Sequence, residues 1–196
     1  MALWGNSDSD ESKPKWLTTA QKKEVFANTS GWVVEGGSAM TGNDNTNAAP
    51  EILVAIGNLT TGIGAADVTE VVWITTAADK SAGFTLSVRV RYNEAVTVTG
   101  SPTIAVTNGN EGSGSGRGPH TLVYASGTGT NELVFSLAIA AGNAATNADD
   151  VLTVAAQNIA KPGGATMKDT ADGTTDSAVA VSAAAVASTG SITVVA

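Results

Sequence analysis

One segment of the chain alternates apolar and polar residues more regularly than any other, and it constrains the fold most. Residues 84–92 read Phe-Thr-Leu-Ser-Val-Arg-Val-Arg-Tyr, with an apolar side chain at every second position. Successive side chains of a β-strand point to opposite faces, whereas an amphipathic helix needs apolar residues three or four positions apart. The segment is therefore predicted to be a strand with one buried face. Arg89 and Arg91 are expected on the opposite face.

Similar segments recur through the rest of the chain, with turn residues between them. Leu133, Phe135, Leu137 and Ile139 repeat the alternation. Shorter strands are expected at residues 68–76, 95–99, 103–107, 121–125, 151–155 and 191–195. Short strands joined by Gly, Asn and Thr turns are typical of an antiparallel sandwich. We therefore predict an all-β fold with a β-sandwich domain over residues 65–196, in which the alanine-rich residues 178–187 stay open between strand and helix.

The first 64 residues lack this regular pattern and are expected to form an N-terminal arm or small subdomain. A short helix is predicted over residues 18–26, with Thr18 or Thr19 as its N-cap. Strands are predicted at residues 31–35 and 51–56. The domain boundary is placed between residues 64 and 65, in a glycine-rich stretch.

Two tryptophans in this N-terminal region, Trp4 and Trp16, are candidates for contact with a partner. An exposed tryptophan is costly unless another surface covers it, and the ends of domains are often poorly ordered unless something holds them. Docking onto a partner and folding back onto the sandwich are both open alternatives.

Composition and charge exclude several classes of function. The formal net charge is -8, and an acidic surface repels phosphate, so no nucleic-acid partner is expected. The absence of cysteine excludes disulfides, thiolate metal sites and thiol nucleophiles. No apolar run of about 18 residues and no secretory leader pattern is visible, so no membrane contact is expected and assembly is expected in a cytosol.

The residues that could support catalysis or cofactor binding are few and scattered. His120 is the single histidine, and we expect it at the start of a strand and partly exposed. The glycine-rich residues 109–118 lack the Gly-Lys-Ser/Thr of a phosphate-binding loop. They are predicted to form a flexible loop that could present Arg117 to a neighbour. No enzymatic activity and no cofactor are predicted.

Carboxylates gather at Asp149 and Asp150 and again at Asp169, Asp172 and Asp176. Neither group has the ligand spacing of an EF-hand loop, and turn formation accounts for aspartates beside glycine. No metal site is predicted, and calcium binding is the alternative for these residues.

Three blocks of sequence resemble the bacterial Ig-like repeats of large surface adhesins. The blocks are residues 92–104, 124–135 and 163–169, which include Asn93-Glu94-Ala95-Val96 and Tyr124-Ala125-Ser126-Gly127-Thr128-Gly129-Thr130. They stand in the order found in those repeats and span roughly residues 84–177. The resemblance implies an immunoglobulin-like sandwich without enzymatic activity.

The opening residues 1–8, together with residues 11–15, resemble the start of virion structural proteins of T4-like phages of marine bacteria. Adhesins carry such Ig-like repeats in tandem, whereas one copy is visible in this chain. The two resemblances together imply a capsid decoration or head-stabilising protein. A neck or tail component and a module that binds host-surface carbohydrate are the alternatives.

The expected location is the virion, assembled in the host cytoplasm. The expected partners are the major capsid protein or other virion proteins, or further copies of the chain. The residues singled out as partner-binding candidates are Trp4, Trp16, Arg89, Arg91 and Arg117.

Overall fold

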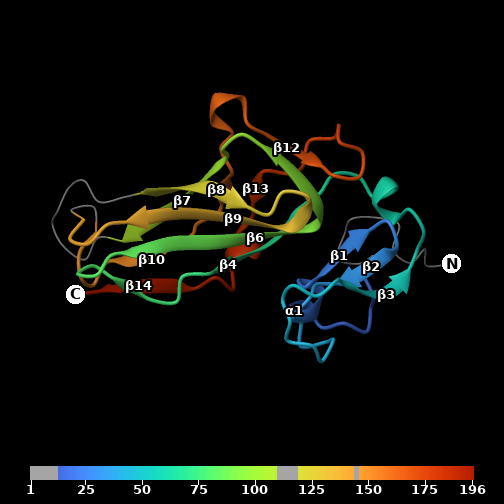
Figure 1. Ribbon diagram of the computed structural model, residues 1–196, viewed down its shortest axis with the longest axis horizontal. Coiled ribbons are helices and arrows are strands. Elements are labelled where there is room, and N and C mark those ends of the chain that lie inside the picture. The colour runs from blue at the N-terminus through green and yellow to red at the C-terminus, as the bar shows by residue number, and fades with distance from the viewer. Residues whose placement is uncertain (1–12, 110–118, 144–145) are drawn as a thin grey trace.

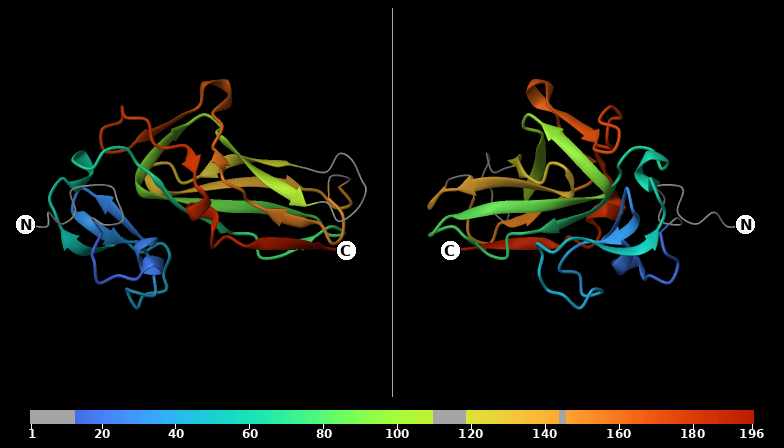
Figure 2. Two further views of the ribbon diagram at one scale, coloured as in Figure 1. Left: turned by 180° about the vertical axis from the view of Figure 1, so that it is seen from behind. Right: turned by 45° about the vertical axis from the view of Figure 1, so that its right-hand side comes forward.

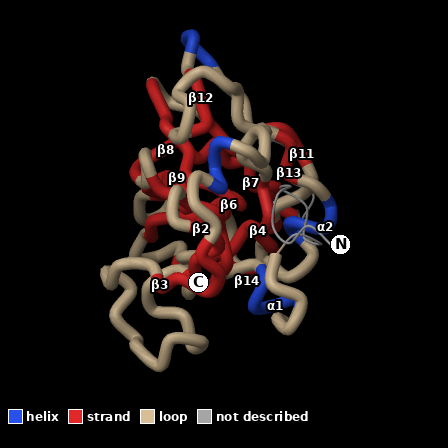
Figure 3. Tube along the Cα trace, turned by 90° about the vertical axis from the view of Figure 1, so that its right-hand side faces the viewer, coloured by secondary structure: helices blue, strands red, loops and turns tan. Residues whose placement is uncertain are grey.

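A computed structural model describes residues 13–109, 119–143 and 146–196 of the chain, and the fold is all-β with a few helical turns (Figures 1 and 3). The strands are β1 (Val25–Asn28), β2 (Gly31–Val34), β3 (Glu51–Ala55), β4 (Val68–Trp73), β5 (Ala78–Asp79), β6 (Phe84–Thr99), β7 (Thr103–Gly109), β8 (His120–Ser126), β9 (Thr130–Ile139), β10 (Val151–Thr153), β11 (Gln157–Asn158), β12 (Thr166–Asp169), β13 (Ala180–Val181) and β14 (Ser191–Val195). The helices are α1 (Thr19–Lys22), α2 (Ala183–Val186) and the 3₁₀ turns η2 (Leu59–Thr61) and η3 (Pro162–Gly164). The predicted all-β class is confirmed.

Most of the strands belong to one mixed sheet. Its strands are hydrogen-bonded in the order β3-β2-β1-β6-β9-β8-β7-β10-β14-β5, and β4 and β12 also pair with β6. Most pairings are antiparallel, but β1 meets β6 and β14 meets β5 in parallel. Figures 1 and 2 show β6, β9, β10 and β14 running along the long axis, with β1, β2 and β3 at one end.

The larger hydrophobic core lies where this sheet folds back on itself. Val88 and Val90 of β6 stand opposite Phe135 and Leu133 of β9, and all four side chains are fully buried. The same cluster takes buried residues from strands further along the path: Ile104, Val106, Leu122, Leu152 and Val194. Side chains of β6 and β9 therefore meet side chains of β10 and β14 across one core. The predicted alternation of residues 84–92 is confirmed from Leu86 to Tyr92.

A second hydrophobic cluster belongs to the N-terminal unit, a name used here for residues 13–64. Its largest buried side chain is Trp32 of β2, which is 1% exposed. The buried members of this cluster are Leu17, Val25, Ala27, Trp32, Val34, Leu59 and Ile63. None of them belongs to the larger cluster, whose members begin at Ala66. Residues 65–196 are called the C-terminal unit below.

The predicted N-terminal helix is correct at its start and wrong at its end. The Thr18 hydroxyl caps α1 by accepting from the backbone N–H of Gln21, and the Gln21 side-chain oxygen accepts from the backbone N–H of Thr18. Helix α1 ends at Lys22, and Val25 and Phe26 begin β1 instead. Both side chains are buried in β1, because pairing with β2 covers more of their surface than one more helical turn would.

Two other segments differ from their predicted form. Residues 95–99 do not make a separate strand but continue β6, which is 16 residues long. The ambiguous residues 178–187 divide into β13 and α2, with Ser182 between them. The Ser182 hydroxyl accepts from the backbone N–H of Ala185, and this N-cap selects the helical form for the alanines that follow.

Candidate functional site

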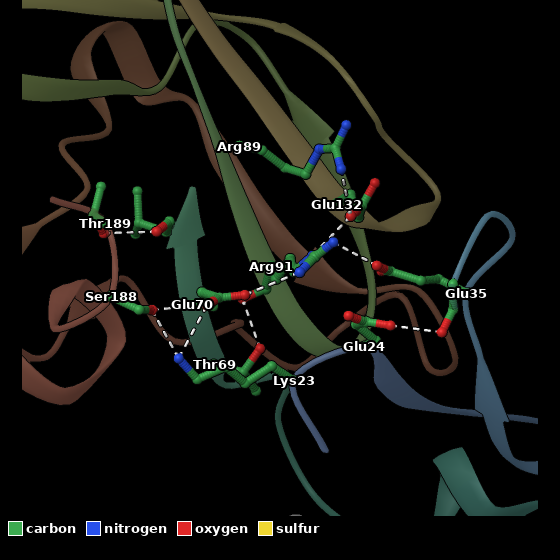
Figure 4. A network of polar contacts seen from close by, with 12 residues as sticks. Lys23, Glu24, Glu35, Thr69, Glu70, Arg89, Arg91, Glu132, Ser188 and Thr189 are labelled. Carbon is green, nitrogen blue, oxygen red and sulfur yellow. Dashed lines mark hydrogen bonds and ion pairs between the residues drawn. The ribbon is translucent and has the colours of Figure 1, made fainter. Parts of the chain in front are cut away.

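The most highly organised polar site surrounds Arg91, whose guanidinium contacts three carboxylates (Figure 4). Its Nη1 lies 2.9 Å from Glu70 Oε2, its Nε lies 2.9 Å from Glu132 Oε1, and its Nη2 pairs with Glu35 Oε1. The Arg91 side chain is only 13% exposed. A guanidinium carries five N–H donors in one plane, so one arginine can donate to three carboxylates at once.

Strand register brings these groups into one row. Arg91 of β6 stands opposite Glu132 of β9 and next to Glu70 of β4, because β6 pairs with both strands. The three side chains share the outer face of the sheet, opposite the hydrophobic core. Glu35 comes from outside this sheet face and follows the end of β2 in the N-terminal unit. The row therefore becomes a contact between the two units.

Further charged groups extend the row on both sides. Lys23 Nζ lies 3.0 Å from Glu70 Oε1, and the Ser188 hydroxyl donates to the same oxygen at 2.9 Å. On the other side Arg89 Nη1 lies 3.2 Å from Glu132 Oε1. The term charged cluster is used below for Lys23, Glu24, Glu35, Glu70, Arg89, Arg91 and Glu132.

Two glutamates of this cluster have shifted pKa values, since the pKa of Glu35 is raised and that of Glu70 is lowered. Desolvation by burial raises the pKa of Glu35 to about 8, the attraction of Arg91 opposes that rise, and the carboxylates of Glu132 and Glu24 add to it. Burial also works to raise the pKa of Glu70, but hydrogen bonds from Lys23, Ser188 and Arg91 outweigh it and hold that pKa below its ordinary value. The cluster therefore contains one carboxyl group that keeps its proton near neutral pH.

Two clefts adjoin the cluster where the loop after β2 faces the sheet. One of about 540 Å³ is lined by Glu24, Arg89 and Arg91 together with the loop. The other, of about 400 Å³, is lined largely by uncharged polar groups and small apolar side chains: Phe26, Asn28, Thr46, Asn47, Ala48, Pro50, Ala95, Thr130 and Asn131. Glu35 and Glu132 line both, so the clefts meet at the ion-pair row.

The loop that forms the outer wall of both clefts is closed by contacts of its own. The two ends of this loop lie close together at Gly36 and Ala48. A Cβ on Gly36 would lie 2.4 Å from the carbonyl oxygen of Ala48, so only glycine fits at this position. Asn43 and Asn45 accept from backbone N–H groups two residues further on. These local bonds fix the turn of the loop.

The candidate residues chosen from the sequence fall in different places. Trp4 and Arg117 lie outside the described residues. Trp16 lies just before α1 and is 60% exposed. Arg89 and Arg91 occupy the outer face as expected, and both contact carboxylates of the same chain. Glu35 and Glu70 were not anticipated, since neither belongs to a motif.

A second buried polar group lies at the far end of the C-terminal unit. His120, expected to be partly exposed, is 6% exposed, and its Nε2 lies 3.4 Å from Asn108 Nδ2. The same amide nitrogen donates to Asp150 Oδ2 at 3.0 Å. Burial lowers the pKa of His120, although Asp150 works against that shift. These contacts join β7, β8 and the turn before β10.

Asp172 and Asp149 occupy turns, whereas Asp169 ends strand β12 and Asp176 pairs with Lys168. Asp172 accepts from the backbone N–H groups of Thr174 and Thr175, and Asp149 occupies a left-handed conformation with φ of 69°. Within residues 13–109, 119–143 and 146–196, no group of three or more histidine, cysteine, aspartate or glutamate side chains could hold a metal ion. Nor does that part of the chain contain a helix with the length and apolar character needed to cross a membrane.

Comparisons with known proteins find no matching family model, no matching curated protein and no matching solved structure.

Proposed function

We propose that this chain is a structural, non-enzymatic protein of a bacteriophage virion, a decoration protein bound to the outer shell. The observation that carries the proposal is a β-rich fold in which β4-β6-β9-β8 and β7-β10-β14 are runs of neighbouring strands, joined to an N-terminal unit with a hydrophobic cluster of its own. The proposed partner is the major capsid protein or another virion protein, and the proposed place of assembly is the host cytoplasm. The resemblances of residues 1–15 and 84–177 to phage structural proteins and Ig-like repeats supply the location.

The strand order supports an Ig-like sandwich for the C-terminal unit. An immunoglobulin constant-type domain has strands A, B, E and D in one sheet and C, F and G in the other. If β4, β6, β7, β8, β9, β10 and β14 are taken as A to G, the neighbours β4-β6-β9-β8 and β7-β10-β14 agree with that order, and an additional pairing of β7 with β8 joins the two groups. Strand β5 pairs in parallel with β14, as the second half of a divided first strand would.

The N-terminal unit supports a role in anchoring. Its Trp16 is the most exposed large hydrophobic side chain of the described residues, at 60%. Tryptophan is enriched among residues that dominate the binding energy of interfaces, because it buries a large area with few rotatable bonds. Repetition over many copies on a shell would multiply a modest contact into stable attachment.

The anchoring role is tested by adding variant chains to particles that lack this protein and measuring occupancy by quantitative gel densitometry. Deletion of residues 2–12 spares Lys13, which is 1% exposed and donates to the carbonyl of Lys22 at 2.8 Å. We expect this deletion, and separately Trp16→Ala, to weaken binding by about tenfold or more.

Ile74→Ala is the matched control, since Ile74 is also an exposed apolar side chain, at 40%, and lies in the C-terminal unit. It should bind like the unaltered chain. Full occupancy by both N-terminal variants, with folding verified by circular dichroism, would contradict the anchoring role.

Two alternatives have their own tests. A neck or tail component would be present in the low copy number of a ring rather than across the shell. Carbohydrate binding is favoured by the cleft of about 400 Å³, whose lining includes the amides of Asn28, Asn47 and Asn131. Binding of glycans by residues 65–196 or by the full chain would support it.

A further inference from the structure

We propose that the charged cluster is a proton-dependent latch, which holds the N-terminal unit against β6 and β9 at neutral pH and releases it in alkaline solution. The inference concerns the movement of one unit against the other. It does not depend on the virion role.

The contact between the units is suited to such a change because it is not an extended hydrophobic core. The two hydrophobic clusters have no residue in common. Over the part of the chain that the structure describes, the units meet through the parallel bridge between Ala27 of β1 and Glu94 of β6 and through the charged cluster. Phe26 of β1 also lines a cleft together with Ala95 and Thr130 of the C-terminal unit. Opening this contact would expose Ala27 and Phe26 of β1, while most members of both clusters belong to other segments.

The composition of the cluster leaves an excess of negative charge when every group is ionised. Its cations are Lys23, Arg89 and Arg91, and its carboxyl groups are Glu24, Glu35, Glu70 and Glu132. The one surplus negative charge is neutralised if one carboxyl group keeps a proton. Like charges held close together in a partly buried site disfavour ionisation of one of them.

Glu35 is the carboxyl group placed to keep that proton. Its Oε1 pairs with Arg91, and its Oε2 is buried without a hydrogen bond to the described residues. Glu132 of β9 faces it across Arg91, and Glu24, which accepts from Ser38 at 2.6 Å, faces it from the segment before β1. Ionised Glu35 would meet two negative neighbours with one shared cation.

The direction of the pH dependence follows from the pKa of Glu35. Its value in the folded chain, about 8, is above the ordinary 4.5. A carboxyl group whose pKa is raised in the closed state stabilises that state at pH values below its ordinary pKa. This stabilisation is lost as pH rises from the ordinary pKa through the raised one. Glu70 has a lowered pKa, so its contribution is present above the ordinary value and is lost only in acid.

The latch is tested by measuring the distance between the units with paired spin labels. The chain has no cysteine, so Ala49→Cys in the N-terminal unit and Thr121→Cys on β8 give two unique and exposed attachment sites. In the otherwise unaltered chain we expect one narrow distance distribution at about pH 6. A longer and broader population should grow as pH rises through about 8.

Glu35→Gln removes the titrating group and keeps its size, so this variant should give the narrow distribution at both ends of the pH range. Glu51→Gln is the matched control, because Glu51 is exposed on β3 and outside the cluster. It should respond as the unaltered chain does.

A third variant keeps the test decisive if Glu35→Gln does not fold. Glu24→Gln removes the surplus negative charge, so it should give a smaller long-distance population at about pH 10 than the unaltered chain. An unaltered chain whose distances do not change between about pH 6 and about pH 10 overturns the proposal. The same holds if both Glu24→Gln and Glu35→Gln behave like Glu51→Gln.

Discussion

At the scale of single residues, the arrangement around Arg91 explains why two arginines on the same strand face differ in importance. Arg91 contacts three carboxylates and its side chain is 13% exposed, whereas Arg89 has one ion pair and a side chain that is 34% exposed. Loss of Arg91 removes the donor that three partly buried carboxyl groups share, although Lys23 still pairs with Glu70 and Arg89 with Glu132, whereas exposed pairs contribute little. The two arginines hold equivalent positions in the alternating pattern of the strand, so the difference in their expected effect on stability comes from their contacts alone.

Arg91→Met should therefore lower the free energy of unfolding by about 3 kcal/mol at neutral pH. Arg89→Met should cost less than about 1 kcal/mol. The measurement is urea denaturation followed by far-UV circular dichroism. Because the carboxylates left by Arg91→Met repel one another, the loss of stability should diminish in acid, where carboxylates take up protons. A similar loss in both variants at all pH values would contradict the assigned role of Arg91.

At the scale of elements, β6 does more than the alternation in its first half indicates. It pairs with β9 up to Arg91 and with β4 up to Tyr92, and after an irregularity it pairs from Val96 onward with β12 and once more with β9 at Thr130. Asn93 and Glu94 lie at this irregularity and are at most 1% exposed. One strand therefore serves two neighbourhoods, with the contact to β1 at the bend between them.

The turn between β8 and β9 fixes the register that places Glu132 beside Arg91, and Gly127 is the residue that this turn requires. Gly127 has φ of +107°, and a Cβ there would lie 1.9 Å from the carbonyl oxygen of Glu132. Gly129 has φ of +80°, and a Cβ there would meet no atom within 4 Å. A side chain at Gly127 would therefore collide with the backbone, whereas a side chain at Gly129 would meet only the conformational cost of a positive φ.

Gly127→Ala should lower the free energy of unfolding by about 3 kcal/mol or more, and Gly129→Ala by only about 1 to 2 kcal/mol. Both values would be measured by chemical denaturation at the same pH. Equal costs for the two substitutions would show that the turn can relax away from Glu132.

At the scale of the whole molecule, the two hydrophobic clusters differ greatly in size. The cluster of the C-terminal unit draws on most of the long strands, whereas that of the N-terminal unit has seven buried residues. Segments of about fifty residues are marginally stable alone, because a core of that size supplies only a few kcal/mol. The N-terminal unit is therefore expected to depend on its neighbour for stability.

Residues 65–196 expressed alone should unfold in one cooperative transition, whereas residues 13–64 alone should show little protection of backbone amides. The excised C-terminal unit should be less stable than the full chain, because Arg91 loses Glu35, and Glu70 loses Lys23. Hydrogen exchange and calorimetry would measure both effects. Independent folding of residues 13–64 would contradict the dependence.

Sequence periodicity by itself determined the all-β class, the buried stripe from Leu86 to Tyr92 and the outward position of Arg89 and Arg91. These properties are local, since the period of two is a consequence of strand geometry. The domain boundary and the virion role stay predictions. The helix predicted through Phe26 was wrong because local propensity does not include the partner strand that buries Val25 and Phe26.

Only the tertiary structure decided which groups meet at Arg91. Glu35, Glu70 and Glu132 are separated from it by 56, 21 and 41 positions, and no spacing rule connects them. Their meeting depends on the register of β4, β6 and β9 and on the packing of the N-terminal unit against them. Register and packing are set by cooperation among distant strands, so the sign of a charge can be read from the sequence but its partner cannot.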